Sequence, residues 1–435
     1  MHRLVLINQN KIDLRIAVQS RGVNIARMGV SFTRINTKFE NMIISERLKS
    51  NLLCKNANLI LFALLFFISN QTINSQSKTS GLPVIDLTHD YPKKDMYLED
   101  IADTEYIPLE TTDDILLSGE AKLSYVSDKY ILVYEPNRGD IYVFNRTGKL
   151  HSHFNNKGQS GREYSNIGYG GAIFDEKNAE IYVCSHKIQV YSPNGEYKRT
   201  LNINALWNER NVFNFDNEML LVYDGLIIES GKEKNKNEKP YYLISKKDGS
   251  TTYVFDIHLP KRYSTYIIEH VGHNTSNVRS IAFSKSMHYG EDFVIADISS
   301  DTLYLLTSKK KLTPILVRMP SVHTSSNSRM IWTTLITTDK FILIGYFDIN
   351  SKGGGIPNLI YEFETGEISN LQKFDTVFHS GVGGNRNTAT AKNTFAELIE
   401  ASEMIRVYKK KRLKESIVKK IKEDDNQIVR IIKFK

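Results

Sequence analysis

The sequence predicts an all-β protein, built as a six-bladed β-propeller. From residue 128 onward, short runs of β-branched and aromatic residues recur between turn-forming residues. Glycines close these units 47, 54 and then 117 residues apart, at Gly148, Gly195, Gly249 and Gly366. Such a period is typical of a propeller, because radially packed sheets bury both of their faces against neighbouring sheets.

The strand-like runs can be followed unit by unit. Tyr130–Tyr134 and Ile141–Phe144 form the clearest pair, and the loop between them contains Pro136 and Gly139. Single runs precede the later closing glycines, at Lys187–Tyr191, Tyr241–Ile244 and Leu359–Phe363.

The interval of 117 residues is close to two periods and therefore predicts one more unit. We expect this unit to contain a hairpin of Phe293–Asp297 and Thr302–Leu306 that turns through Ile298–Asp301. Five units and a terminal strand favour six blades, with seven as the alternative.

Two isolated strand-like stretches predict how the ring closes. Thr104–Glu110 precedes the first unit and Ile428–Phe434 follows the last one. Neither stretch is stable alone, so we expect them to pair within one blade and remove the open edges of the ring.

Other segments interrupt the repeats. Ala396–Lys422 carries apolar residues at helical spacing and predicts a helix on the outside of the ring. Segments rich in charged or small residues are expected to be loops, at Gly231–Pro240, Ser321–Ser328, Asn350–Asn358 and His379–Lys392.

The N-terminal 75 residues resemble an export signal with an extension. Leu59–Ile68 is an apolar run of ten residues, about 15 Å long as a helix, whereas a hydrocarbon core is about 30 Å thick. Lys49 and Lys55 precede it and a polar stretch follows, which predicts a secretory signal cleaved after Ser75. Residues 1–41 are unusual for a signal, so Met42 is an alternative start. A buried core helix is the alternative interpretation of the apolar run.

The resulting organisation has three parts: residues 1–75 as extension and signal, 76–103 as a lead-in, and 104–435 as the propeller. We expect an exported monomer, either periplasmic or at the cell surface, without a membrane span after cleavage. Cys54 precedes the apolar run and Cys184 is alone in the mature part, so no disulfide and no cysteine zinc site can form there.

The charge is unevenly distributed. The formal net charge of the chain is +8, but residues 1–75 contribute +7 of it and residues 76–435 only +1. The overall basic character is therefore no argument for nucleic-acid binding, and no nucleic-acid partner is expected.

One family resemblance is carried by residues 158–195. Gly158-Gln-Ser-Gly161-Arg-Glu163-Tyr164, then Phe174-Asp175, Ile181–Val183, Lys187–Tyr191 and Gly195 resemble an NHL-type propeller repeat. The chain looks most like the six-bladed NHL/TolB-like propellers that bacteria export, although Ser160 and Arg162 replace their usual glycines. The end of the chain, Asp424–Asn426 with Ile431–Phe434, also resembles their closing strand. The resemblance spans residues 84–435 and implies the fold rather than an activity.

Histidine pairs are the first candidates for chemistry. His151 and His153 would share one face of a strand and could hold zinc with a third ligand, while an exposed outer strand is the simpler interpretation. His270 and His273 are spaced i, i+3 in a segment that the pattern does not assign.

Acidic residues are the second candidates. Glu163 and Tyr164 could belong to a catalytic site, but local backbone bonding by Glu163 and packing of Tyr164 between blades is the favoured interpretation. Aspartates at turns could converge on the central channel and bind Ca²⁺, the one cofactor left open, at Asp128, Asp140, Asp175, Asp297 and Asp301. Backbone bonding at turns explains them equally well.

The strongest basic run is Lys409–Lys414, followed by Lys419, Lys420 and Lys422. It could attract nucleic acid or anionic lipid headgroups, and a solvated helix face is the simpler interpretation.

These patterns favour a binding module for an envelope protein, a peptide or a glycan. No Gly-x-Ser-x-Gly, His-Glu-x-x-His or Walker motif is present. The alternatives are a metal-dependent hydrolase or lyase with its site in the central channel, and a structural envelope component. The sequence assigns no catalytic, ligand-binding or metal residue.

Overall fold

The computed structural model describes two compact units, Met1–Thr79 and Ser80–Lys435. In the first unit only a hairpin is described, β1 (Val5–Asn8) with β2 (Lys11–Leu14), so the expected signal lies outside the described residues. In the second unit the described ranges are 81–168, 170–203, 210–230, 232–234, 239–259, 261–264, 266–270, 276–280, 286–324, 330–348, 358–374, 391–410 and 415–435.

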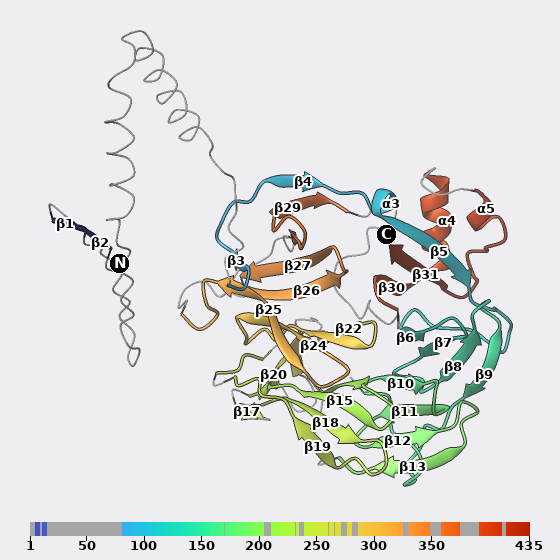
Figure 1. Cartoon of the computed structure of the whole chain (residues 1–435). Coiled ribbons are helices and arrows are strands. Elements are labelled where there is room, and N and C mark those ends of the chain that lie inside the picture. The colour runs from blue at the N-terminus through green and yellow to red at the C-terminus, as the bar shows by residue number, and fades with distance from the viewer. Residues whose placement is uncertain are drawn as a thin grey trace, which may run out of the picture. The chain divides into compact units, whose positions relative to one another are not determined.

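The second unit is a ring of six sheets, which confirms the predicted six-bladed propeller (Figure 1). Blade 1 contains β6 (Lys122–Val126), β7 (Tyr130–Tyr134), β8 (Ile141–Asn145) and β9 (Leu150–Phe154). Blade 2 contains β10 (Ala172–Asp175), β11 (Glu180–Cys184), β12 (Ile188–Tyr191) and β13 (Tyr197–Leu201). Blade 3 contains β14 (Arg210–Asn214), β15 (Met219–Asp224), β18 (Tyr241–Ser245) and β19 (Thr251–Val254).

The remaining blades include strands from the N-terminal lead-in. Blade 4 contains β22 (Ser286–Tyr289), β23 (Asp292–Ile295), β24 (Thr302–Leu306), β25 (Leu312–Met319) and β3 (Val84–Asp86). Blade 5 contains β26 (Met330–Thr337), β27 (Phe341–Asp348), β28 (Asn358–Glu362), β29 (Ile368–Lys373) and β4 (Lys93–Asp95). Blade 6 contains β30 (Thr394–Ile399), β31 (Ile428–Phe434) and β5 (Ala102–Pro108).

Apolar side chains fill each junction between neighbouring blades. Ile181 and Val183 pack with Leu132 and Val143 between blades 1 and 2, for example, and Trp332 packs with Leu303 between blades 4 and 5. Alternate residues of one strand point to opposite faces, so each sheet contributes to two such clusters. This arrangement is why the apolar runs are buried throughout rather than on one side only.

The ring closes as the sequence predicts. β5 pairs antiparallel with β31 from Ala102 opposite Phe434 to Pro108 opposite Ile428. The lead-in before β5 was not recognised as strands: β3 adds in parallel to β25 and β4 adds in parallel to β29. Both strands have three residues, which is too short to show an alternating pattern.

The expected helix over Ala396–Lys422 is wrong in its first part. Leu398 lies in β30, and the helices are α4 (Ala401–Lys409) and α5 (Glu415–Val418). Phe395, Ala396 and Ile399 are buried within blade 6, so packing selects a strand there although the apolar spacing also fits a helix. A third short helix, α3 (Leu98–Ile101), precedes β5.

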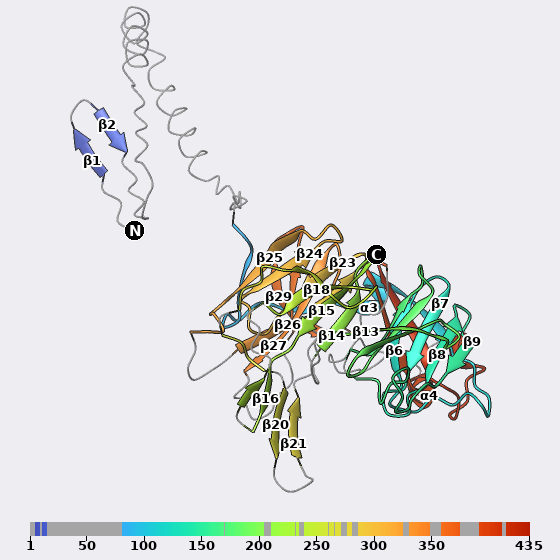
Figure 2. The same ribbon diagram turned by 90° about the horizontal axis from the view of Figure 1, so that it is seen from below.

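The expected loop Gly231–Pro240 also contains a strand. β17 (Lys232–Lys234) joins β16 (Ile227–Glu229), β20 (Tyr266–His270) and β21 (Ser276–Ser280) in a separate insert sheet. This sheet comes from the β15–β18 connection and from the segment between blades 3 and 4. Figure 2 shows that it projects from one side of the ring.

The strands of a blade alternate in direction, so their connections lie on two opposite faces. In blades 1–5 the connections from first to second and from third to fourth strand have at most five residues, and we call their side the turn face. The other connections define the loop face, which includes the insert sheet.

The α4–α5 connection lies on the loop face as well. β30 begins beside Asn393, whose side chain bonds Asp339 in the turn between β26 and β27. β30 ends beside Glu400, and Gln427 joins Glu400 to the carbonyl of Ser118 ahead of β6. β30 thus runs from the turn face to the loop face.

Candidate functional site

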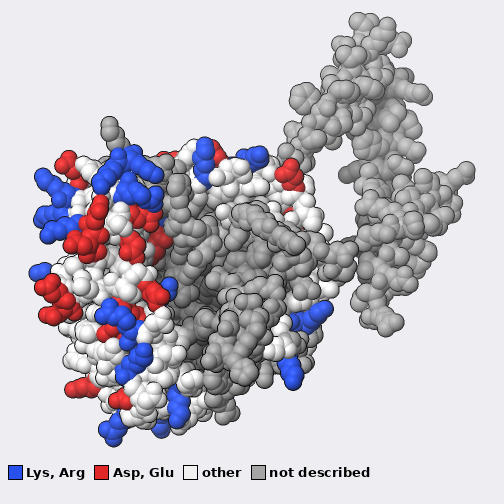
Figure 3. Space-filling model, turned by 180° about the vertical axis from the view of Figure 1, so that it is seen from behind, with Lys and Arg blue, Asp and Glu red and all other residues white. Residues whose placement is uncertain are grey.

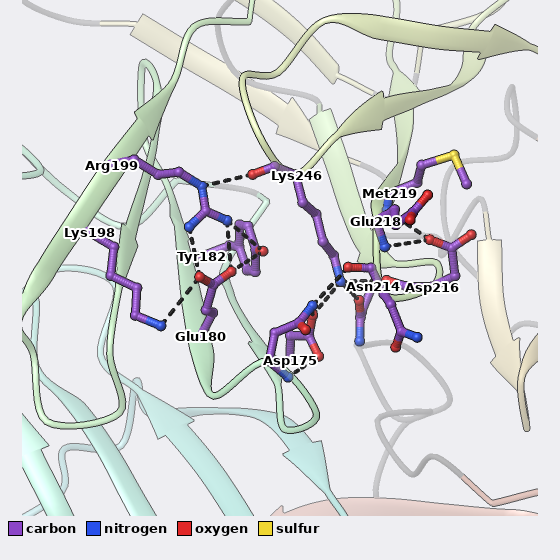
Figure 4. Close-up of polar contacts among 12 residues, drawn as sticks. Asp175, Glu180, Tyr182, Lys198, Arg199, Asn214, Asp216, Glu218, Met219 and Lys246 are labelled. Atoms are coloured by element: carbon purple, nitrogen blue, oxygen red, sulfur yellow. Dashed lines mark hydrogen bonds and ion pairs between the residues drawn. The ribbon is translucent and has the colours of Figure 1, made fainter.

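A buried lysine joins blades 2 and 3 on the turn face (Figure 4). The side chains of Lys246 and Asp175 are only 4% and 3% exposed, and they form an ion pair. Lys246 Nζ also donates to Asn214 Oδ1 at 2.6 Å and to the backbone carbonyl of Asp216. Its three N–H donors therefore meet three acceptors, and burial lowers the pKa of Lys246 against the attraction of Asp175.

We call the contacts of Lys246 with Asp175, Asn214 and Asp216 the joint. An arginine–glutamate pair extends the joint along blade 2. Arg199 Nη1 and Nη2 each lie 2.7 Å from an oxygen of Glu180, and Tyr182 Oη donates to Glu180 Oε2 at 2.6 Å. Burial opposes the charged form of Glu180, but these hydrogen bonds outweigh it and lower its pKa to about 2. Arg199 Nε donates to the carbonyl of Lys246 at 2.9 Å, which links the two pairs.

The joint is a structural element rather than a reactive centre. The ammonium of Lys246 and the carboxylate of Glu180 are already bonded to protein groups, so neither offers a free position to a ligand. A buried charge network of this kind is costly to disturb. The turn face therefore holds blades 2 and 3 together.

The motif around Glu163 has the local role that the sequence favours. Glu163 Oε2 accepts the backbone N–H of Ser160 at 2.8 Å, and this bond lowers the pKa of the Glu163 carboxyl. Tyr164 is fully buried among residues of blades 1 and 2, and its hydroxyl donates to the carbonyl of Gly139 at 2.6 Å. A Cβ at Gly158 would lie 2.0 Å from Glu163 Oε2, so a larger residue there would displace the Glu163 carboxylate.

The two histidines of β9 lie on an exposed outer strand. His151 and His153 alternate with less exposed residues, and His153 Nε2 lies 2.9 Å from Asp140 Oδ1. The His153 ring stacks on Tyr142 with centroids 4.4 Å apart. Within the described ranges, no group of three or more His, Cys, Asp or Glu side chains could hold a metal ion. His270 ends β20, while His273 lies outside the described residues.

The five aspartates that could have shared a Ca²⁺ site in the channel lie on two different faces of the ring. Asp128 belongs to a turn-face connection and Asp175 ends β10 at the same face, whereas Asp140, Asp297 and Asp301 belong to loop-face connections. Aspartate is common in turns at both ends of strands because its side chain accepts hydrogen bonds from nearby backbone N–H groups. Asp297 Oδ1, for example, accepts the N–H of Ser299 at 2.8 Å.

The loop face of blade 4 carries a rigid polar layer. Asp297 is 1% exposed and accepts a hydrogen bond from Tyr241 Oη at 3.4 Å. The side chain of Arg318 is 1% exposed, and its guanidinium donates to the carbonyl of Pro320 at 3.0 and 3.1 Å. Burial lowers the pKa of Arg318 to about 10, although Asp301 lies 3.7 Å away. The β23–β24 connection is thus a fixed part of this face.

A second polar layer joins blades 6 and 1. The side-chain amide of Asn426 donates to the carbonyls of Glu110 at 2.7 Å and Ile115 at 2.8 Å, and its oxygen accepts the N–H of Leu117 at 2.8 Å. Glu135 is 1% exposed and accepts the N–H of Ser118 at 2.6 Å. These contacts fix the segment before β6 and hold the ring closed on the loop face.

A comparison with known protein families identifies the family of this chain. A family described as a domain of unknown function, DUF4934, matches residues 82–433. The chain belongs to the DUF4934 family. No curated protein matches the sequence.

One of the similar solved structures supports the fold of this DUF4934 domain. A presumed exported protein from Bacteroides fragilis is 10% identical, with a TM-score of 0.52 over 82% of this chain and 100% of the other. A DUF4221 member from Bacteroides vulgatus is 10% identical, with a TM-score of 0.43 over 77% and 97% of the two chains. Virginiamycin B lyase from Staphylococcus aureus is 8% identical, with a TM-score of 0.33 over 76% and 99%. At 10% identity, the likeness to the Bacteroides fragilis protein concerns the fold alone.

The polar layers of the DUF4934 domain could not be found from sequence. Asp175 and Lys246 are 71 residues apart, Arg318 stands in a segment without a recognised motif, and the resemblance around Asn426 concerns a strand rather than a polar layer. Their positions next to turns were the only available signal. Among the described residues, no helix is both long and apolar enough to cross a membrane.

Proposed function

We propose that this DUF4934 protein is exported and acts as a binding module for a protein, peptide or glycan held on the loop face. The observation that carries the proposal is the difference between the two faces. Turn-face connections in blades 1–5 have at most five residues, whereas the β15–β18 connection has 16 and the β30–β31 connection has 28. Recognition normally uses loops that a rigid scaffold positions.

Export is supported by the N-terminal sequence. The ten-residue apolar run Leu59–Ile68 follows Lys49 and Lys55, as in a secretory signal. The similar Bacteroides fragilis protein is a presumed exported protein, which agrees with this proposal. A periplasmic or cell-surface position fits both observations. The proposed relationship to NHL/TolB-like propellers fits them as well, since the proteins that this chain resembles are exported by bacteria.

Binding fits the described polar groups better than catalysis does. The carboxylates of Asp140, Asp175 and Asp297 are each engaged by neighbouring protein groups, on two different faces of the ring. A hydrolase or lyase would need reactive groups from several blades at one place. No described cluster favours that alternative.

Glycan and peptide arrays test the proposal with the full chain. A variant with residues 265–281 replaced by a short Gly-Ser linker removes β20 and β21 from the loop face. The control carries Lys177→Gln, Lys309→Gln and Lys340→Gln, three exposed positions in turn-face connections. Circular dichroism would verify that both variants fold.

We expect the loop variant to lose array binding at least tenfold and the control to keep it. Binding lost only in the turn-face control would contradict the proposal. Chemical conversion of a bound array ligand would favour an enzyme instead.

A further inference from the structure

The connection between β30 and β31 concentrates positive charge on the loop face. Residues 406–422 contain nine Lys or Arg and one acidic residue, Glu415. The mature chain from residue 76 has a net charge of only +1, so its remaining residues together carry −7. We call the exposed, described part of this segment the basic rim; its members are Arg406, Lys409, Lys410, Lys419, Lys420 and Lys422.

Figure 3 shows the side of the ring toward which the insert sheet projects. Lys and Arg side chains gather at its upper left edge, where α4 and α5 lie, with Asp and Glu side chains directly below them. The positive charge is thus local and stands next to a region of opposite sign. A partner attracted by this field would approach one edge of the loop face.

Four lysines of the basic rim have no carboxylate partner among the described residues. Arg406 is paired with Glu403 at 2.9 Å and Lys409 with Glu423 at 3.1 Å. In the part of the chain that the structure describes, no ion pair involves the side chains of the other four, which are Lys410, Lys419, Lys420 and Lys422. The neighbouring Asp425 accepts the backbone N–H of Lys422 at 2.8 Å, so it is bonded to the backbone. Four ammonium groups therefore remain available to an external anion.

The buried apolar face of α4, the helix that carries Arg406 and Lys409, packs against blade 6 rather than facing outward. Met404 and Val407 of α4 are buried against Ile399 and Ile428 of blade 6. A helix that binds in a bilayer interface needs exposed apolar side chains next to its charges. The insert sheet also projects farther than α4 in Figure 2, so a flat bilayer parallel to this face would meet the insert sheet first.

We infer that the basic rim binds a linear polyanionic polysaccharide, one with sulfate or carboxylate groups along the chain. Five of the six members of the basic rim are lysines. Lysine is a hydrated point charge that suits repeated contacts with a charged polymer, whereas paired recognition of a single carboxylate favours arginine. A narrow polymer can lie along α4, α5 and the following turn. This inference rests on the proposed function and adds a ligand chemistry to it.

Heparin affinity tests the inference with the purified full chain. The variant carries Lys419→Gln, Lys420→Gln and Lys422→Gln, and the matched control is the turn-face triple variant Lys177→Gln, Lys309→Gln and Lys340→Gln. Both variants lose three charges at exposed positions. We expect the rim variant to bind heparin roughly tenfold or more weakly at physiological salt, and the slope of log affinity against log salt to fall by roughly one per charge. The control should match the unmodified protein.

Three results would overturn the inference. The unmodified chain could fail to bind heparin, both triple variants could weaken equally, or neutral dextran could bind as well as heparin. Binding to phosphatidylglycerol vesicles without binding to heparin would assign the rim to a membrane instead. If the protein failed to bind heparin, only the inference about the basic rim would be contradicted. The proposal of a binding module would still be tested by the arrays, which include neutral glycans and peptides.

Discussion

The two faces of the ring are built from the same strands but differ in what their connections do. On the turn face, short connections and the Lys246–Asp175 joint hold neighbouring blades together. On the loop face, the connections add a separate sheet and two helices, and the basic rim lies at its edge. The difference indicates that one face maintains the fold while the other is free to diversify.

The comparison predicts that the largest loss of stability comes from the turn face. Lys246→Met would leave Asp175 buried without its counter-charge, and we expect the free energy of unfolding to fall by about 3–5 kcal/mol. Urea denaturation measures this change. Lys247→Met, at the exposed neighbouring position, should cost less than about 0.5 kcal/mol. Equal effects of the two substitutions would mean that the joint is not stabilising.

A pair of glycines tests how tightly the turn face of blade 1 contacts strand β5 of blade 6. Gly148 and Gly366 both have positive φ, at +83° and +72°, but only at Gly148 would a Cβ meet backbone, 2.0 Å from the carbonyl oxygen of Pro108. Gly366→Ala should cost about 1–2 kcal/mol from backbone strain alone. Gly148→Ala should cost about 3 kcal/mol because the strain and the clash add. Thermal denaturation of both variants measures the difference, and similar midpoints would contradict the tight contact.

The loop face has a stabilising element of its own at the ring closure. Asn426→Ala would remove three hydrogen bonds to backbone groups, and we expect a loss of about 2 kcal/mol in the free energy of unfolding. Hydrogen exchange should become faster in β5, while β11 of blade 2 stays protected. Asp424→Ala, an exposed position nearby, is the control. Unchanged exchange in β5 would show that Asn426 does not hold the closure.

The smallest expected effect is a pH dependence that appears only in acid. The pKa of Glu180 is about 2 in the folded protein against its ordinary value of 4.5. Because the folded pKa is the lower one, the stabilisation is complete above about pH 5 and is lost as the pH falls toward 2. Glu180→Gln should flatten the stability profile in this window, as measured by urea denaturation at successive pH values. An unchanged acid slope in this variant would contradict the assignment.

The sequence predicts the repeating part of the fold better than its additions. Paired apolar runs and closing glycines identify the hairpin of Phe293–Asp297 with Thr302–Leu306, because each blade buries both faces. The pairing of β5 with β31 could be predicted because both stretches look like strands in the sequence and neither has a strand-like neighbour along the chain. In contrast, β3 and β4 are stabilised by partners more than 200 residues away, which no local pattern reveals.

The candidate site is less predictable for a related reason. The polar layers depend on groups such as Asp175 and Lys246, which come together only when blades pack, whereas the basic rim is visible in the sequence because its charges are adjacent. What the sequence could not provide is the face on which that run lies. The direction of β30 determines it.

Hydrogen exchange of the full chain, with and without an array-selected ligand, tests the central claim most directly. We predict protection confined to loop-face connections, among them 135–140, 225–240, 296–301 and 400–427. Protection confined to the turn-face connections 176–179 and 246–250 would contradict the account.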